Sequence, residues 1–376
     1  MTLDALRERF RRVAISHEWL TIPGGSEKVV LQLLELFPDA DVYTSVYDPE
    51  LSPEPIRRAR VHPSFLNRLP GAKRHYPRLL PLMNIAFESF DLDGYDLVLS
   101  SNHACAKNVI TAPGTLHVCY CHTPMRYAWN PGFMAGERLG RAERVLLPFL
   151  LSRLRRQDMI ASARPDFYVA NSRHVAERIR KYYRRDAFII HPPVDVEPFL
   201  DLPREDRGYY LFLGRLVPYK RADVAVASCA RLGRRLKVVG EGRGESRVLA
   251  AAGPDTEFLG RLDDTALRGV LAGARALLFP GEEDFGMVPV EAQAAGVPVI
   301  AYGRGGARDS VEDGVTGVLY DDPGVEGLSA AIERFETLIF DEGEMRRRAA
   351  GFAPGRFRSE IADLLTTLDP EVRASP

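Results

Sequence analysis

The chain has 376 residues, of which 45% are hydrophobic, so it is long enough to bury two ordinary cores. Its net charge is −1, with 27 Lys and Arg against 21 Asp and Glu up to Asp195 and 23 against 30 after it. Neither half is basic enough to indicate a nucleic-acid-binding protein, and the contrast suggests that one half meets an anionic surface or substrate.

The chain has no apolar run near the roughly 20 residues that a membrane-spanning helix needs. Its first twelve residues contain four arginines and lack the apolar region of a signal peptide, so we expect a cytoplasmic protein. The few cysteines indicate reduced core thiols rather than a disulfide scaffold or a zinc site. They are Cys105, Cys119, Cys121 and Cys229.

Short apolar runs alternate with helical patterns along the first half and predict strands at 13–16, 41–44, 96–99, 117–120, 167–170 and 188–190. A glycine pair, Gly24-Gly25, follows the first of these strands and precedes a helix. Glycine permits close backbone approach, so the pair either lends N–H groups to an anion or only makes a tight turn. Because the pattern is not G-x-G-x-x-G, it does not favour a nicotinamide cofactor. Asp91 and Asp93 superficially resemble a metal-binding D-x-D, but their position before a strand indicates a turn.

The fourth predicted strand ends in His122, and Arg126, Tyr127 and Trp129 follow it closely. A single histidine at a strand end is most often structural, and the three residues after it can equally form a packed aromatic corner. Two further segments, 73–82 and 142–159, interleave basic and apolar residues. Each predicts either a membrane-surface segment or a core helix with a solvated edge.

A Pro-rich stretch at 191–204 separates this half from a second series of predicted strands, at 209–213, 236–239, 257–259, 276–279, 297–300 and 317–320. Strands alternating with helices predict an α/β protein with two doubly wound parallel sheets. We place one domain at 1–195 and the other at 208–355. Ligands are expected at the carboxyl ends of the strands.

The first strand of the second half leads into Gly214-Arg215 and, five residues later, Lys220. One explanation is an ordinary basic loop. However, cations at the start of a helix oppose the helix dipole, which favours the other explanation, an anionic ligand. Arg215 offers a planar fork of donors and Lys220 a mobile charge, a pairing that suits a diphosphate.

Glu283 and Glu291 flank a Phe-Gly pair directly after the predicted strand at 276–279. The layout predicts a strand, a loop and a helix whose N-terminus binds anions, with Glu283 in the loop and Glu291 about two turns into the helix. Two carboxylates that accept hydroxyl hydrogen bonds beside an anion site indicate a sugar nucleotide. The alternative is solvated helix charge.

These elements together resemble the retaining nucleotide-sugar glycosyltransferases of family 4. The shared elements are E-x-F-G-x-x-x-x-E at 283–291, G-R-x-x-x-x-K at 214–220, G-G-x-E-K-V at 24–29 and H-T-P-x-R-Y at 122–127. The last is similar to an element of bacterial mannosyltransferases. The resemblance covers nearly the whole chain and implies the GT-B fold: two Rossmann-like domains, the first binding the acceptor and the second the nucleotide sugar. It also implies a C-terminal helix, within 356–376, that returns to the first domain.

The resemblance implies that Arg215, Lys220, Glu283 and His122 carry catalysis, with His122 beside the donor hexose. It implies no metal and no cofactor, because the two cations neutralise the diphosphate. Arg126, Tyr127 and Trp129 would line the acceptor side. The implied donor-binding residues are Gly24, Gly25, Arg215, Lys220, Arg261, Leu262, Glu283, Phe285, Gly286, Met287, Val288 and Glu291.

The function implied is transfer of mannose from GDP-mannose to a glycan or polyprenyl-diphosphate-linked acceptor in bacterial surface polysaccharide synthesis, with contact to the inner face of the cytoplasmic membrane. A UDP-sugar donor is one alternative. A nucleotide-sugar epimerase of GT-B fold is another, because fold does not decide function. A third is a catalytically inert carbohydrate-binding subunit.

Overall fold

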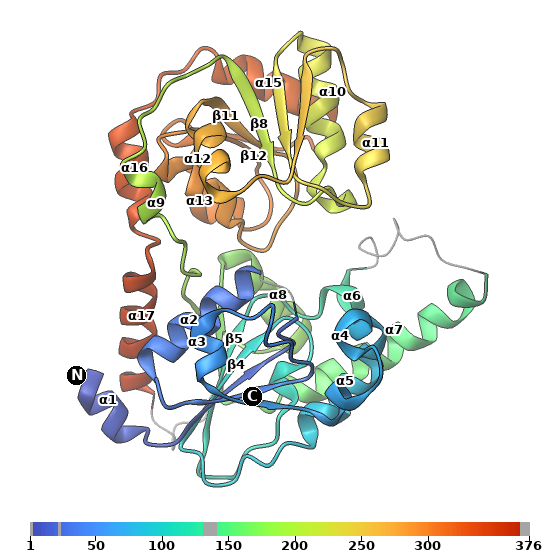
Figure 1. Cartoon of the computed structure of the whole chain (residues 1–376), viewed down its shortest axis with the longest axis vertical. Coiled ribbons are helices and arrows are strands. Elements are labelled where there is room, and N and C mark those ends of the chain that lie inside the picture. Colours follow the sequence, from blue (N-terminus) through green and yellow to red (C-terminus); the bar gives the residue numbers. More distant parts are fainter. Residues whose placement is uncertain (1–2, 22–23, 131–140, 369–376) are drawn as a thin grey trace. The chain divides into compact units, whose positions relative to one another are not determined.

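A computed structural model describes residues 3–21, 24–130 and 141–368, with side chains described outside 141–145 (Figure 1). It divides the chain into two compact units. Unit 1 comprises Met1–Pro193 and Phe357–Pro376, and unit 2 comprises Val194–Arg356. Within the described ranges, no helix is both long and apolar enough to cross a membrane.

Unit 1 is built on a parallel sheet of seven strands in the order β3-β2-β1-β4-β5-β6-β7. Its strands are β1 (Val13–His17), β2 (Asp41–Thr44), β3 (Arg60–Pro63), β4 (Leu97–Asn102), β5 (Leu116–Cys121), β6 (Phe167–Ala170) and β7 (Phe188–Ile189). Its α-helices are α1 (Leu3–Arg9), α2 (Gly25–Leu36), α3 (Glu54–Arg58), α4 (Ala72–His75), α5 (Leu80–Glu88), α6 (Arg126–Trp129), α7 (Arg141–Ala161) and α8 (Arg173–Tyr183). Short 3₁₀ helices occupy η1 (Phe65–Arg68), η2 (Tyr76–Leu79) and η3 (Ala106–Asn108).

Unit 2 has a parallel sheet of six strands in the order β10-β9-β8-β11-β12-β13. Its strands are β8 (Tyr209–Leu213), β9 (Leu236–Val239), β10 (Thr256–Gly260), β11 (Ala274–Phe279), β12 (Val299–Tyr302) and β13 (Gly317–Tyr320). Its helices are α9 (Glu197–Leu200), η5 (Pro218–Lys220), α10 (Ala222–Leu232), α11 (Glu245–Ala250), α12 (Asp264–Ala272), α13 (Met287–Ala294), α14 (Ala307–Ser310), α15 (Val325–Phe335) and α16 (Glu342–Ala350). The last helix, α17 (Pro354–Thr367), begins in unit 2 and continues in unit 1.

Each sheet is covered on both faces, which explains why central strands such as β1, β4 and β5 are buried at every residue. In β8, Tyr209 and Leu211 enter one buried cluster, whereas Tyr210 and Phe212 enter another. In β1, Val13 and Ile15 likewise pack opposite to Ala14. Figure 1 shows the helices on the two sides of the unit 2 strands.

The strand order reverses beside β1 in unit 1 and beside β8 in unit 2. In unit 1, strands β2 and β4 flank β1, and in unit 2, β9 and β11 flank β8. At such a point, the connections after two neighbouring strands run in opposite directions. The loops at the carboxyl ends of these strands therefore diverge, which leaves room for a ligand. Each unit therefore has one expected ligand position.

Several boundaries differ from the sequence predictions. The strand predicted at 297–300 is β12 (Val299–Tyr302), because the proline at 298 has no N–H and contributes only its carbonyl, which accepts from the Leu277 N–H at 2.9 Å. Strand β3 was not predicted, because it is a largely exposed edge strand without an apolar run. Glu291 is the fifth residue of α13, about one turn into the helix rather than two.

The stretch expected to link the domains is partly folded into unit 2. Val194, Val196 and Phe199 are buried in its core, so unit 2 begins at Val194 rather than at residue 208. At the other end of the chain, Phe357, Ile361 and Leu365 of α17 are buried in the core of unit 1. The segment from Phe357 therefore belongs to unit 1.

Candidate active site

The loop after β8 carries the two predicted phosphate-binding cations. Gly214 has a φ of +153° at the end of this strand, a backbone conformation that favours glycine. A Cβ at Gly214 would lie 3.2 Å from Lys220 Cδ, so the glycine also makes room for the lysine side chain. Lys220 ends η5, and its side chain is only 12% exposed. Arg215 is exposed and donates to the Tyr219 hydroxyl at 3.3 Å.

Lys220 and Glu283 form an ion pair that joins the loops after β8 and β11. The Glu283 side chain is 18% exposed. The backbones of the two loops lie very close, since a Cβ at Gly281 would be 2.8 Å from Lys220 Cα. The structure thus brings together two predicted site residues that are 63 positions apart in the sequence.

The loop that follows Glu283 is held by glycines. Gly286 caps the N-terminus of α13 with a φ of +85°, and a Cβ there would be 2.7 Å from the Phe279 ring. Gly306 donates its N–H to the Glu283 carbonyl at 2.8 Å. A Cβ at Gly306 would lie 2.3 Å from Phe285 Cα, so only glycine fits. The loop is therefore set in one position against the turn at Gly305-Gly306.

Helix α13 starts directly after this loop, so its first-turn N–H groups, including those of Met287 and Val288, lie next to Glu283 in the chain. Phe285 is buried and packs on Phe352, with ring centroids 5.7 Å apart. A helix N-terminus beside a lysine and a carboxylate can bind an anion and neighbouring hydroxyls.

Arg261 and Leu262 follow β10, which is separated from β8 by β9. Leu262 packs against the same apolar cluster as Met287 and Val288. This places Leu262 in the α13 face of unit 2. Arg261 is exposed, and its predicted contact with the donor stays a prediction.

In unit 1, the carboxyl ends of β1, β4 and β5 bring the buried His17 and Ser101 together with the partly buried His122. Strand register pairs His17 with Ser101, and His122 follows β5. Ser101 Oγ lies 3.1 Å from His17 Nδ1 and 2.9 Å from His122 Nε2. On the other side of His17, the Nε2 atom is 3.7 Å from Glu27 Oε1. Sequence analysis selected only His122 from this group.

Burial lowers the pKa of His122 well below its usual value, and the neighbouring His103 and His17 lower it further. Burial also lowers the pKa of His103. Since an imidazole with a lowered pKa is neutral at pH 7, each ring presents one donor and one acceptor nitrogen there. His122 can therefore hydrogen-bond a hydroxyl group without bringing positive charge.

Glu18, which sequence analysis did not select, braces this part of unit 1. Its buried carboxylate accepts from the backbone N–H groups of His103, Ala104, Cys105 and Ala106, at 2.7–3.0 Å. These residues form the loop after β4 that carries His103. Four N–H groups meeting one carboxylate fix the loop, and no local sequence pattern predicts such a contact.

The predicted glycine pair lies at the start of α2. Gly24 is its N-cap, with φ −155° and ψ −174°, and Gly25 is its first residue. This extended backbone suits any residue, so Gly24 is not required by its φ. A Cβ there would instead meet Glu27 Oε2 at 2.9 Å. The glycine leaves space for the Glu27 carboxylate.

Helix α6 carries the three residues predicted to line the acceptor side. The Trp129 indole donates to Asp158 Oδ2 at 2.6 Å and stacks on Tyr182, with ring centroids 4.6 Å apart. Tyr127 packs against a buried cluster of unit 1. All three side chains are partly exposed, but the contacts of Trp129 favour the alternative of a packed aromatic corner for that residue.

Other sequence predictions are confirmed. All four cysteines are free and buried. Asp91 Oδ1 accepts from the Asp93 N–H at 3.1 Å, so this pair forms a turn.

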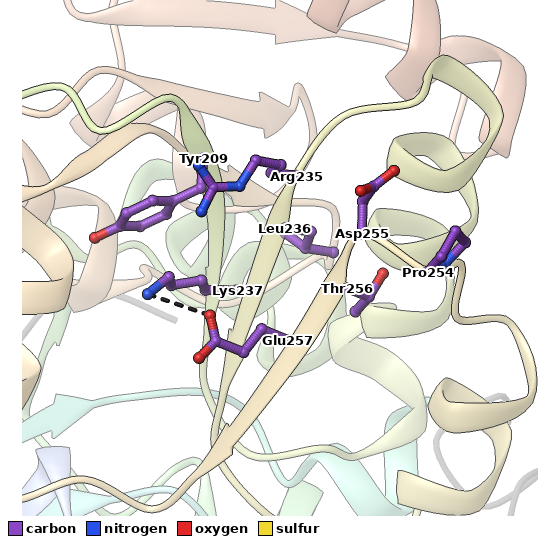
Figure 2. A pocket seen from close by; sticks show the side chains of 8 residues that line it. All are labelled: Tyr209, Arg235, Leu236, Lys237, Pro254, Asp255, Thr256 and Glu257. Atoms are coloured by element: carbon purple, nitrogen blue, oxygen red, sulfur yellow. Dashed lines mark ion pairs between the residues drawn. The ribbon is translucent and has the colours of Figure 1, made fainter.

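A cavity of about 220 Å³ lies at the opposite end of the unit 2 sheet (Figure 2). Its walls include Tyr209, Leu236 and Thr256, which begin β8, β9 and β10. The Lys237–Glu257 pair, 3.3 Å apart, crosses it. It lies at the amino ends of the strands, away from Lys220 and Glu283, and we do not assign it to the site.

Two protein-family models match adjoining parts of the chain. Glycosyltransferase Family 4 matches residues 23–198, and Glycosyl transferases group 1 matches residues 196–353. Lys220, Glu283 and the whole of α13 lie in the second match, and His122 lies in the first.

Curated relatives match about two fifths of the chain. A stretch of 174 residues is 35% identical to glycogen synthase of Mycobacterium tuberculosis, covering 42% of this chain and 40% of that protein. A stretch of 197 residues is 30% identical to D-inositol 3-phosphate glycosyltransferase of Mycobacterium marinum, covering 45% of this chain and 41% of that protein. The match therefore spans about two fifths of these relatives' length.

Solved structures resemble the chain along nearly its whole length. Anabaena HepE in complex with UDP gives a TM-score of 0.69 at 17% identity, covering 95% of this chain and 100% of that one. Sucrose-phosphate synthase of Thermosynechococcus elongatus gives 0.68 at 19% identity, covering 94% and 98%. At this identity the likeness establishes a shared fold.

Proposed function

We propose that the chain is a family 4 glycosyltransferase of GT-B fold and that it transfers a hexose from a nucleotide sugar to a glycan or lipid-linked acceptor. The observation that carries the proposal is the Lys220–Glu283 pair beside the N-terminus of α13. The pair lies, with the N-terminus of a helix, at the carboxyl ends of neighbouring strands, where ligands bind in such sheets.

We assign the donor's parts to residues of unit 2 as follows. Arg215 and Lys220 bind the diphosphate and neutralise the charge that grows as the nucleotide leaves. Glu283 accepts hydrogen bonds from hexose hydroxyls, and the backbone from Phe285 to Met287 holds the same sugar. Glu291, in the second turn of α13, accepts from the ribose hydroxyls.

We propose a retaining transfer on one face of the sugar. The bond between the anomeric carbon and the phosphate oxygen breaks as the acceptor oxygen bonds the same carbon, and the leaving phosphate takes the acceptor's proton. His122 contacts the hexose near that carbon. Arg215 and Lys220 supply the positive charge, so the proposed reaction uses no metal and no cofactor.

We propose GDP-mannose as the donor, supported by the resemblance of residues 122–127 to those of mannosyltransferases. A UDP-sugar is the second candidate, since HepE was solved in complex with UDP and with UDP-glucose. The test is calorimetric titration with GDP, UDP, ADP and GDP-mannose without divalent metal, repeated on Glu291→Ala.

We expect tight GDP binding that weakens in the variant. A preference for UDP keeps glycosyl transfer but discards mannose. If neither the nucleotides nor GDP-mannose bind, the proposed function is wrong. Release of GDP from GDP-mannose then distinguishes a transferase from a protein that only binds the nucleotide sugar.

A role in bacterial surface polysaccharide synthesis would bring the acceptor to a membrane, and helix α7 supports such contact. Leu146, Phe149 and Ile160 are 64%, 73% and 67% exposed and share one helical stripe with the exposed Arg153 and Arg156. Apolar and basic side chains on one face suit an anionic lipid surface.

The membrane proposal is tested by sedimentation with vesicles. Vesicles containing anionic lipid should carry the protein down, and neutral vesicles should carry much less. Phe149→Ser should reduce the bound fraction, whereas Ile339→Ser, at a 97% exposed position in unit 2, should not. Equal binding by both variants would contradict a role for α7.

A further inference from the structure

Ser101 links two histidines that come from different strands. His17 lies opposite it in the register of β1 and β4, and the His122 N–H donates to the Asn102 carbonyl at 2.8 Å, which fixes where the chain leaves β5. The Ser101 side chain is buried, and its oxygen is within hydrogen-bond distance of both rings, at 3.1 Å and 2.9 Å. The serine therefore holds His122 through one ring nitrogen.

A serine hydroxyl has a single hydrogen, so it donates to one ring and accepts from the other. When Ser101 donates to His17 Nδ1, His122 Nε2 carries a hydrogen and donates to Ser101. When the serine hydroxyl rotates, it donates to His122 Nε2 instead, and His17 Nδ1 carries the hydrogen and donates to Ser101. The hydrogen position on His122 is thus linked to the hydrogen position on His17.

The free nitrogen of His17 faces a carboxylate. His17 Nε2 is buried without a hydrogen-bond partner, and Glu27 Oε1 is 3.7 Å away. Burial by itself raises the pKa of Glu27, but the nearby His17 ring outweighs this effect and lowers it. An ionised carboxylate at this place favours a hydrogen on Nε2 and resists rotation of the His17 ring.

We propose that Ser101 is a positioning residue for His122 and that the His17–Glu27 pair holds Ser101 in place. The inference rests on the proposed function, in which His122 contacts the donor hexose. It also explains the Gly24 position, where a side chain would collide with the Glu27 carboxylate. Ser101, His17 and Glu27 act through His122 and need not touch the sugar.

The neighbouring residue provides a matched control. Ser100 Oγ lies 2.9 Å from His117 Nε2, also buried, and successive residues of a strand point to opposite faces. Ser100→Ala therefore removes a hydrogen bond of the same kind and length without touching His122. Comparing Ser101→Ala with Ser100→Ala separates positioning of His122 from the general cost of losing a buried serine.

The kinetic test measures release of the nucleotide from GDP-mannose and from UDP-glucose by hydrolysis. Ser101→Ala should lower kcat at least tenfold and leave KM within about threefold. The reason is that a His122 ring that is not held in place stabilises the transition state less, while substrate binding changes little. Ser101→Thr, which keeps the hydroxyl, should recover most of the rate. The inference fails if Ser101→Ala loses no more activity than Ser100→Ala.

A spectroscopic test does not depend on activity. The ring ¹⁵N resonances of His122, assigned with His122→Asn, should move in Ser101→Ala and in Glu27→Leu and stay in place in Ser100→Ala. Glu27→Gln, whose amide oxygen keeps a partial negative charge facing His17, should move them less. Unmoved resonances in Glu27→Leu overturn the role of the His17–Glu27 pair. If the wild type turns over neither nucleotide sugar, the proposed function fails, while this measurement still decides the inference.

Discussion

Lys220 and Glu283 neutralise each other in unit 2. A lysine paired in this way can turn to a diphosphate only by giving up some of its interaction with the carboxylate. Glu283→Gln should therefore release Lys220 and leave the affinity for free GDP or UDP unchanged or tighter. The same variant should lower hexose turnover at least tenfold, about 1.4 kcal/mol, because the amide accepts hydroxyl hydrogen bonds less strongly.

Lys220→Ala should behave differently, losing affinity for the free nucleotide as well as at least tenfold in turnover. Calorimetry with GDP and UDP separates the two variants, with Glu282→Gln as the control at the adjacent, exposed position. Tenfold weaker nucleotide binding by Glu283→Gln would contradict a competition between carboxylate and phosphate for Lys220.

Gly306→Ala should disturb the Glu283 loop without changing any group that we expect to touch the donor. The added methyl would lie 2.3 Å from Phe285 Cα, so the loop must move. We expect at least tenfold loss of turnover, measured as nucleotide release from the donor. Gly269→Ala is the control, because a Cβ there meets nothing within 4 Å. Wild-type turnover in Gly306→Ala would show that the turn does not position Glu283.

His122→Ala should likewise lower turnover at least tenfold, because the ring contacts the hexose in the proposed reaction. Nucleotide release is again the measurement. His103→Ala is a demanding control, since its ring lies 6.2 Å from that of His122 and comes from the loop after the neighbouring strand β4. A larger loss in His103→Ala than in His122→Ala would move the catalytic assignment to His103.

Sequence patterns were sufficient to predict features that depend on a single helix, strand or loop. The buried strands 167–170, 209–213, 236–239 and 317–320 were predicted with their observed bounds, because apolar runs between turns are local signals. The pattern E-x7-E located Glu283 before α13 for the same reason. The parts that were missed depend on register and distant packing: the four N–H groups on Glu18, the bridge at Ser101 and the edge strand β3.

Lys107 and Asp158 form a buried ion pair whose two side chains are both 0% exposed. Asp158 also accepts from the Trp129 indole and from the Tyr183 hydroxyl at 2.8 Å, so one carboxylate joins η3, α6, α7 and α8. Lys107→Met should lower the free energy of unfolding by about 3–5 kcal/mol, because it leaves a buried charge without its partner. Denaturant unfolding measures this change.

The control for that pair is the exposed Arg58–Glu54 pair, whose loss in Arg58→Met should cost no more than about 1 kcal/mol. The double variant Lys107→Met with Asp158→Leu should recover part of the loss by removing the isolated charge. A cost for Lys107→Met no greater than for Arg58→Met would mean that water reaches Asp158.

His117 should make the protein less stable in mild acid. Burial lowers its pKa from the usual 6.5 to about 3, and the nearby Arg164 and Lys107 contribute. Between these values the unfolded chain binds a proton that the folded chain does not, so stability falls as the pH falls from 6.5 towards 3. The contribution approaches about 1.4 kcal/mol per pH unit in the middle of this range.

His117→Phe removes the titrating group and should flatten the dependence by that amount. The comparison is made by denaturant unfolding of both proteins at pH 7, 6, 5 and 4. Other titrating groups are common to both proteins, so their effects cancel in the difference. The free energy of unfolding of the wild type minus that of the variant should therefore fall as the pH falls, whatever its value at pH 7. Parallel curves would mean that His117 accepts a proton in the folded protein as readily as in the unfolded chain, which its burial beside two cations opposes.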